Sequence, residues 1–92
     1  MDLRQGELLI RIHRFRFLKP SGCGLGGIEL VVEESLTATS DGTPRCTARP
    51  DHHELVPRPE FTVHGETVEE ALGNCLAAIR PRRFFELFLP KA

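Results

Sequence analysis

The sequence contains no tryptophan, no tyrosine and only three cysteines among its 92 residues. Cys23, Cys46 and Cys75 are odd in number and form no CxxC pair, so we expect buried free thiols rather than a secreted disulfide framework. No apolar run approaches the roughly 20 residues that cross a bilayer. The N-terminus also lacks the pattern of a signal peptide. These absences favour a cytoplasmic protein.

Patterns for metal, cofactor or catalytic chemistry are equally scarce. The histidines and cysteines show none of the spacings that mark zinc sites. The stretch SGCGLGG matches GxGxxG at Gly22, Gly24 and Gly27, but a strand rather than a helix is predicted to follow, so a flexible connector is favoured over a phosphate cradle. No acids are paired convincingly for acid–base catalysis. We therefore predict a non-enzymatic protein without cofactor or metal.

Charge is segregated along the chain, although the net charge is only −1. Residues 1–20 and 80–92 each carry a net charge of +3, whereas residues 21–79 carry −7. The basic ends can lie against the acidic middle within one fold, or the split can recruit a charged partner. Arginines interleaved with phenylalanines also resemble nucleic-acid-binding surfaces. The candidate nucleic-acid contacts are Arg11, Arg14, Arg16, Arg82 and Arg83.

Residues 28–39 alternate between apolar and polar side chains, which predicts a half-buried strand. A hairpin to a strand over residues 45–49 follows, with a three-residue loop at Ser40-Asp41-Gly42 that would set Leu36 opposite Cys46 and keep one face apolar. Residues 50–59 hold three prolines, so we expect a loop.

The segment 8–18 is ambiguous because its apolar residues change parity. Ile10 and Ile12 share one face of an extended chain, and Phe15 and Phe17 share the other. A strand with a bulge at His13-Arg14 would place all four on one face. A helix is the competing interpretation, but the many β-branched and aromatic residues favour a strand.

The stretch FTVHGETVEEALGNCLAAIR predicts a short strand over residues 61–64, a turn that Gly65 permits, and a helix. Thr67 opens a capping box with Glu70, in which each side chain accepts from the other residue's amide. The helix carries one apolar stripe and ends at Arg80-Pro81. The acids near its start are better explained as helix stabilisers than as catalysts.

The last residues, 81–92, form a phenylalanine-rich tail. Either a short helix folds back on the core, or the apolar side chains contact a second copy of the chain. The candidate partner or dimer contacts are Phe84, Phe85 and Phe88.

The segment 46–80 resembles the HicB-like family of small antitoxin-type domains, whose helix follows the pattern G-[DE]-T-x-E-E-A-L-x-N-x-x-x-A-I. The matching positions are Gly65, Glu66, Thr67, Glu69, Glu70, Ala71, Leu72, Asn74, Ala78 and Ile79. The resemblance implies a partial RNase H-like fold without nuclease carboxylates, a homodimer, and a function in masking a small basic RNA-cleaving toxin.

Together these observations predict a single α+β domain over residues 1–92. It comprises a basic N-terminal segment (1–20) that forms an extra strand, a HicB-like β-β-β-α core (28–80) and the tail. The expected architecture is an antiparallel sheet of three to four strands with one main helix on one face, plus a short C-terminal helix or strand. The expected function is protein binding; the alternatives are nucleic-acid binding and an oligomeric domain of another kind.

Overall fold

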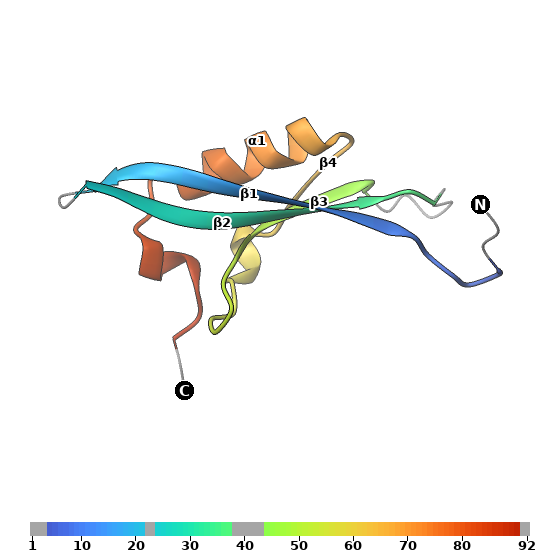
Figure 1. Cartoon of the computed structure of the whole chain (residues 1–92), viewed down its shortest axis with the longest axis horizontal. Coiled ribbons are helices and arrows are strands. Elements are labelled where there is room, and N and C mark those ends of the chain that lie inside the picture. The colour runs from blue at the N-terminus through green and yellow to red at the C-terminus, as the bar shows by residue number, and fades with distance from the viewer. Residues whose placement is uncertain (1–3, 22–23, 38–43, 91–92) are drawn as a thin grey trace.

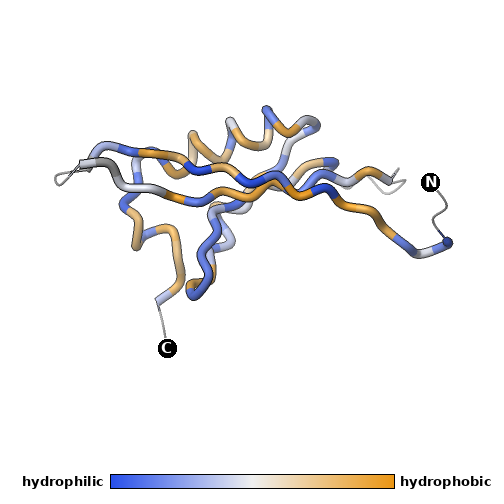
Figure 2. Tube along the Cα trace, viewed as in Figure 1, coloured by the Kyte–Doolittle hydropathy of each residue, from blue (hydrophilic) through white to orange (hydrophobic). Residues whose placement is uncertain are grey.

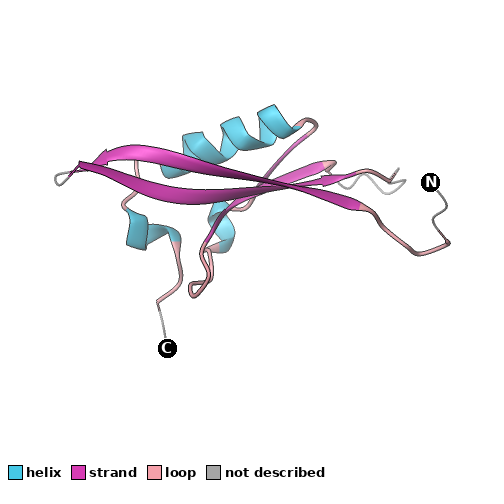
Figure 3. Ribbon diagram, in the orientation of Figure 1, coloured by secondary structure: helices cyan, strands magenta, loops and turns pink. Residues whose placement is uncertain are grey.

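Four antiparallel strands in the order β1-β2-β3-β4 form one sheet in the computed structural model, which describes residues 4–21, 24–37 and 44–90 (Figure 1). The strands are β1 (Ile10–Ser21), β2 (Gly24–Ser35), β3 (Cys46–Asp51) and β4 (Val63–Gly65). One α-helix, α1 (Val68–Ile79), and two short 3₁₀ turns, η1 (Pro59–Phe61) and η2 (Phe84–Leu87), are the other elements of the described residues (Figure 3). The predicted α+β class, with four strands and one main helix, is confirmed.

Strands β1 and β2 form a long hairpin whose register is continuous from Ile10 opposite Ser35 to Ser21 opposite Gly24. The predicted bulge at His13-Arg14 is therefore wrong. An uninterrupted ladder keeps every residue paired, whereas a bulge leaves one residue without a partner. Phe15 and Phe17 pack against the core, while Ile10 and Ile12 remain exposed on the opposite face.

The glycine-rich stretch is not a connector throughout, because β2 begins at Gly24 and includes the next two glycines. Strand β2 ends at Ser35, and Glu34 rather than Leu36 lies opposite Cys46. The register is thus shifted by two residues from the prediction, a shift that preserves the faces because side chains alternate with period two. The predicted turn at Ser40-Asp41-Gly42 and the thiol of Cys23 lie outside the described residues.

The junction between β4 and α1 differs in detail from the sequence prediction. Phe61 belongs to η1, and β4 begins at Val63. Thr67 caps α1 as predicted, its Oγ1 accepting a 3.0 Å hydrogen bond from the Glu70 amide. The Glu70 carboxylate instead accepts from the Glu66 amide, at 3.4 Å. Thr67 therefore caps one helix amide, that of Glu70, and the Glu70 carboxylate binds the amide of the residue before the cap instead of the predicted Thr67 amide.

Gly65 is required by close packing rather than by a turn. Its φ angle is not positive, but a Cβ atom added there would lie 2.5 Å from the Ala71 backbone nitrogen. Only glycine allows β4 to approach α1 this closely. Asn74 strengthens the same junction by donating a 2.8 Å hydrogen bond from Nδ2 to the His64 carbonyl oxygen. Gly65, Thr67 and Asn74 thus hold the strand–helix junction together.

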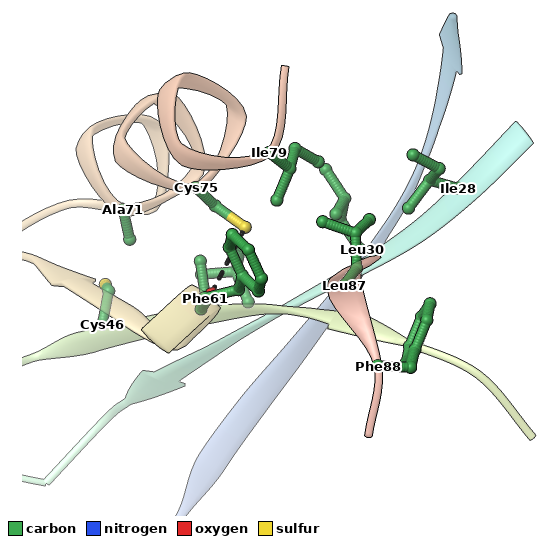
Figure 4. Close-up of a cluster of buried hydrophobic side chains, with 11 residues drawn as sticks. Ile28, Leu30, Cys46, Phe61, Ala71, Cys75, Ile79, Leu87 and Phe88 are labelled. Carbon is green, nitrogen blue, oxygen red and sulfur yellow. Dashed lines mark hydrogen bonds between the residues drawn. The ribbon is translucent and has the colours of Figure 1, made fainter. Parts of the chain in front are cut away.

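The core lies on one face of the sheet, between β2, β3, α1, η1 and the C-terminal segment (Figure 4). One stripe of α1, formed by Ala71, Cys75 and Ile79, is fully buried against it. The thiols of Cys46 and Cys75 are free and buried, as predicted. Burial of large apolar side chains of this kind contributes about 1.5–3 kcal/mol each, so this layer is the main source of stability.

The C-terminal segment folds back onto the same face of the sheet. This agrees with the first of the two predicted alternatives, a short helix that packs on the core. Leu87 is completely buried and Phe88 is 2% exposed. The segment is fixed by the Arg58 amide, which donates to the Leu87 carbonyl at 2.9 Å, and by the Leu89 amide, which donates to the Val56 carbonyl at 2.7 Å. Phe88 is therefore a core residue and not a surface contact, whereas Phe84 and Phe85 remain exposed.

No helix in the described ranges has the combined length and apolar character needed to cross a membrane.

Candidate protein-binding face

The face of the sheet opposite α1 carries a lattice of charged side chains. It is formed by even-numbered residues of β1 and odd-numbered residues of β2 and β3, which the register brings side by side. Three ion pairs link the strands: Arg16–Glu29 at 2.7 Å and Arg49–Glu33 at 3.0 Å join neighbouring strands, and Arg14–Asp51 at 3.1 Å joins β1 to β3 across β2. We call this surface the open face, since no described helix covers it.

Val31 lies at the centre of this lattice and is only 2% exposed. Its neighbours across the strands are Arg14 on one side and Arg49 on the other. Long arginine stems can cover an apolar side chain while their guanidinium groups stay in water. The ion-paired arginines therefore shield an apolar centre on a face that is otherwise solvated.

Apolar side chains on the open face are left uncovered along β1, the edge strand. Leu8, Ile10, Ile12 and Leu18 are 68%, 46%, 54% and 53% exposed. Figure 2 shows the apolar run that leads into β1 extending away from the helix and the C-terminal segment. A groove of about 160 Å³ lies beside it, with Leu8, Ile10, Pro44 and Thr47 among its walls. Exposed apolar side chains on an unpaired edge are typical of interaction surfaces.

The five arginines predicted to contact nucleic acid are not gathered on one surface. Arg14 and Arg16 lie on the open face, where carboxylates pair with them. Arg11 lies at a β1 position of opposite parity, next to Glu34 in the register. Arg82 and Arg83 follow α1 on the core side of the sheet, near Lys19. The open face therefore presents nearly balanced charge rather than a basic patch.

His13 and Glu34 form a further cross-strand pair, with Nε2 and Oε1 3.0 Å apart. This hydrogen bond lowers the pKa of the Glu34 carboxyl below its usual value, against the opposing effect of desolvation. The positive charges of Arg45 and Arg11 lower the same pKa further. Glu34 thus stays ionised at neutral pH as a structural partner of β1.

Three glutamates at the start of α1 behave differently from those of the sheet. Glu66, Glu69 and Glu70 are exposed, and none forms an ion pair with another described residue. Their charges are favourable near the positive end of the helix dipole. They remain available to a basic partner.

His52 is a residue whose role sequence reasoning missed. Its Nδ1 accepts hydrogen bonds from the amides of Glu54 and Leu55, at 3.0 and 3.2 Å. Its ring lies edge-on to Phe84 and Phe88, with centroids 5.8 and 5.6 Å away. His52 therefore joins the proline-rich loop to the C-terminal segment. No sequence pattern predicts the ring contacts of His52, because Phe84 and Phe88 lie more than 30 residues away in the chain.

The described residues include no group of three or more histidine, cysteine or acidic side chains arranged to hold a metal ion. Burial raises the pKa of the Cys75 thiol to about 11 and also raises that of Cys46. Both thiols are protonated at neutral pH, and a protonated thiol is a poor nucleophile.

No protein-family model, no curated protein and no solved structure matches this chain.

Proposed function

We propose that this protein is a cytoplasmic, non-enzymatic protein-binding module of the HicB-like kind, which docks a partner along β1 and the open face. The observation that carries the proposal is that β1 combines a free strand edge with exposed apolar side chains. Strand β1 occupies an end position in the sheet, and Ile10, Ile12 and Leu18 are about half exposed on it. A free edge of this kind accepts a further strand from another chain.

The strand is apolar on both faces, which supports the same proposal. Ile10 and Ile12 lie on the open face, and Phe15 and Phe17 lie on the core face, where they are only half-buried. A strand at a solvated edge normally buries one face only. Apolar residues on both faces are instead typical of a strand that is covered on both sides, and a bound partner would supply the missing cover.

The class of partner follows from the resemblance to HicB-like antitoxins, which mask small basic RNA-cleaving proteins. Glu66, Glu69 and Glu70 lie at the start of α1, beside β4 and away from the open face, so they would attract a basic partner only through the long-range field of the protein. Self-association into a homodimer, which the resemblance also implies, would use the same kind of free edge. Nucleic-acid binding is less well supported, because Arg14 and Arg16 are already paired with carboxylates.

The test is recovery of the partner followed by reconstitution. The tagged protein is used to retrieve partners from its native cells, with and without RNase. Each retained protein is purified and titrated against the chain by calorimetry, with RNA cleavage as a second readout. We expect a small basic protein that is retained after RNase treatment and whose cleavage activity the chain inhibits. Retention of RNA alone would contradict the proposal and favour the nucleic-acid alternative.

A matched pair of variants tests the docking surface. Ile10→Thr/Ile12→Thr removes apolar side chains from the open face but keeps β-branched residues in the strand. The control variant, Val56→Thr, changes an apolar side chain that is 60% exposed in the loop between β3 and η1. The double variant should weaken partner binding at least about tenfold, equivalent to about 1.4 kcal/mol, whereas Val56→Thr should leave binding unchanged. Equal affinity for all three proteins would exclude the open face.

A further inference from the structure

A second candidate surface is a pocket between the paired ends of β1 and β2, at Lys19, Pro20 and Gly26, and the segment after α1. Its volume is about 340 Å³, near the lower end of the roughly 300–1,000 Å³ typical of ligand sites. The apolar part of its wall is formed by Pro20, Gly26, Ile28 and Phe84, and its cationic part by Lys19, Arg82 and Arg83. Figure 1 shows the end of α1 next to this end of the hairpin.

The apolar wall is held in place by the core. Ile28 is 5% exposed and belongs to the main cluster of buried side chains. The Phe84 ring packs against the buried Phe88 ring, with centroids 5.2 Å apart, and edge-on against His52. A pocket whose walls are fixed before binding loses little conformational entropy when it is filled. The site can therefore take an apolar group without rearrangement.

The three cationic side chains of the pocket differ in their contacts. Lys19 Nζ donates to the carbonyl oxygens of Arg80 and Arg82, the latter at 2.9 Å. Its charge thereby offsets the negative end of α1, which would otherwise repel an anion. Arg82 and Arg83 are exposed, and their guanidinium groups form no ion pair with another described residue. They are free to bind a ligand.

Among the described residues, no carboxylate lines this pocket. The acid nearest in sequence, Glu86, accepts a 2.8 Å hydrogen bond from the Arg83 amide and lines a neighbouring depression that it shares with Arg82, Arg58 and Glu60. On the open face, Arg14, Arg16 and Arg49 are each paired with a carboxylate. The pocket therefore combines an apolar wall with uncompensated positive charge.

We infer that this pocket binds a small amphipathic carboxylate. Its apolar body packs against Ile28 and Phe84, and its carboxylate meets the guanidinium groups of Arg82 and Arg83, which form favourable planar hydrogen bonds with carboxylates. The cavity volume of about 340 Å³ lies near the lower end of the range for ligand sites and so suits a short chain. This site is independent of the docking surface on the open face.

Three probes with the same apolar chain separate charge recognition from simple apolar filling. The ¹⁵N-labelled full chain is titrated at pH 7 and constant ionic strength with hexanoate, 1-hexanol or hexylammonium, and amide shifts are followed by NMR. Hexanoate should shift the amides of Lys19, Gly26, Ile28 and Arg82–Phe84 and bind at least about fivefold more tightly than hexanol; hexylammonium should not bind. Equal affinity for hexanoate and hexanol, or shifts confined to other residues, would overturn the inference.

Two double variants then test which side chains bind the carboxylate of the ligand. Arg82→Gln/Arg83→Gln should reduce hexanoate affinity to that of hexanol and leave hexanol binding unchanged. Arg4→Gln/Arg45→Gln removes the same total charge away from the pocket and should leave both affinities unchanged. Lys19 is kept because of its contacts with the end of α1. Unchanged hexanoate affinity in a folded Arg82→Gln/Arg83→Gln variant, judged by its retained NMR spectrum, would refute the assignment.

Discussion

The guanidinium group of Arg14 and the carboxylate of Asp51 meet across the intervening strand β2, with Nη1 and Oδ2 3.1 Å apart. Arg14 lies on β1 directly opposite Val31 of β2, and Asp51 lies on β3 opposite Glu29. The ion pair therefore spans three strands and runs diagonally across β2, next to Val31. With Arg49 on the other side of Val31, this arrangement accounts for the burial of Val31 on a face that no described helix covers.

Replacing Arg14 tests whether its stem or its charge protects Val31. Arg14→Ala should lower the free energy of unfolding by about 1 kcal/mol, because it removes the apolar stem. Arg14→Met keeps most of the stem and should cost less than about 0.5 kcal/mol, since exposed ion pairs contribute about 0–1 kcal/mol. Urea unfolding followed by circular dichroism gives both values; the chain lacks tryptophan and tyrosine for fluorescence. Equal losses in the two variants would show that the charge dominates.

Two glycine-to-alanine substitutions should have opposite effects. In Gly65→Ala, the new Cβ would lie 2.5 Å from the Ala71 nitrogen and 2.9 Å from its Cα. These are backbone atoms that cannot move independently, so a loss of about 1–3 kcal/mol is expected. In Gly73→Ala, the new Cβ meets nothing within 4 Å, and replacing glycine inside a helix should stabilise by about 0.5–1 kcal/mol. Thermal unfolding distinguishes them, and a neutral Gly65→Ala would contradict the close β4–α1 approach.

Substitution of His52 tests the link between the loop and the C-terminal segment. His52→Ala removes the acceptor for the Glu54 and Leu55 amides and should cost about 1 kcal/mol. His52→Asn places a carbonyl oxygen near the position of Nδ1 and should retain most of the two hydrogen bonds. Hydrogen exchange at these two amides is the direct readout. Equally fast exchange in both variants would mean that the acceptor is not what protects them.

Alkaline pH should destabilise the fold through Cys75. Its pKa rises from 9.0 to about 11 through burial, so the folded state holds the proton more tightly than the unfolded state does. The resulting stability is complete below pH 9 and is lost as the pH rises through about 9 to 11. We expect a loss of about 1–2 kcal/mol between pH 8 and pH 10.5.

The matched control for this effect is Cys75→Ala, which lacks the thiol. Its unfolding free energy should fall less over the same pH range, although the Cys46 thiol, whose pKa burial also raises, still contributes. Few other groups titrate there, since the chain has no tyrosine. A pH dependence identical to that of the wild type would show that Cys75 is not the responsible group.

The local features of the chain were largely readable from its sequence. The period of two in residues 28–39 predicted a strand, and Thr67 with its apolar stripe predicted α1. The cap is confirmed by the hydrogen bond from the Glu70 amide to Thr67. Each of these signals involves residues within one or two turns of one another, so neighbouring side chains are enough to produce it.

The candidate surfaces were less predictable, because they depend on residues far apart in the chain. The parity change between Ile12 and Phe15 is the sequence signal that β1 is apolar on both faces, but the same change also predicts a bulge. A bulge is favoured if all apolar side chains must face one core, and the structure leaves Ile10 and Ile12 exposed instead. The sequence of the tail likewise leaves open whether its phenylalanines join the core or contact another chain, and in the structure Phe88 is buried in the core.

The sequence by itself determined the α+β class, the helix with its Thr67 cap and the apolar face of β2, since alternation, spacing and capping are local properties. Tertiary structure alone decided the register of β2 against β3, the pairing of Arg14 with Asp51, the contact of Lys19 with the end of α1, and the grouping of Arg82 and Arg83 with Ile28. Those relationships join residues that are brought together only when the strands and helix pack, and no local pattern encodes the distance between them.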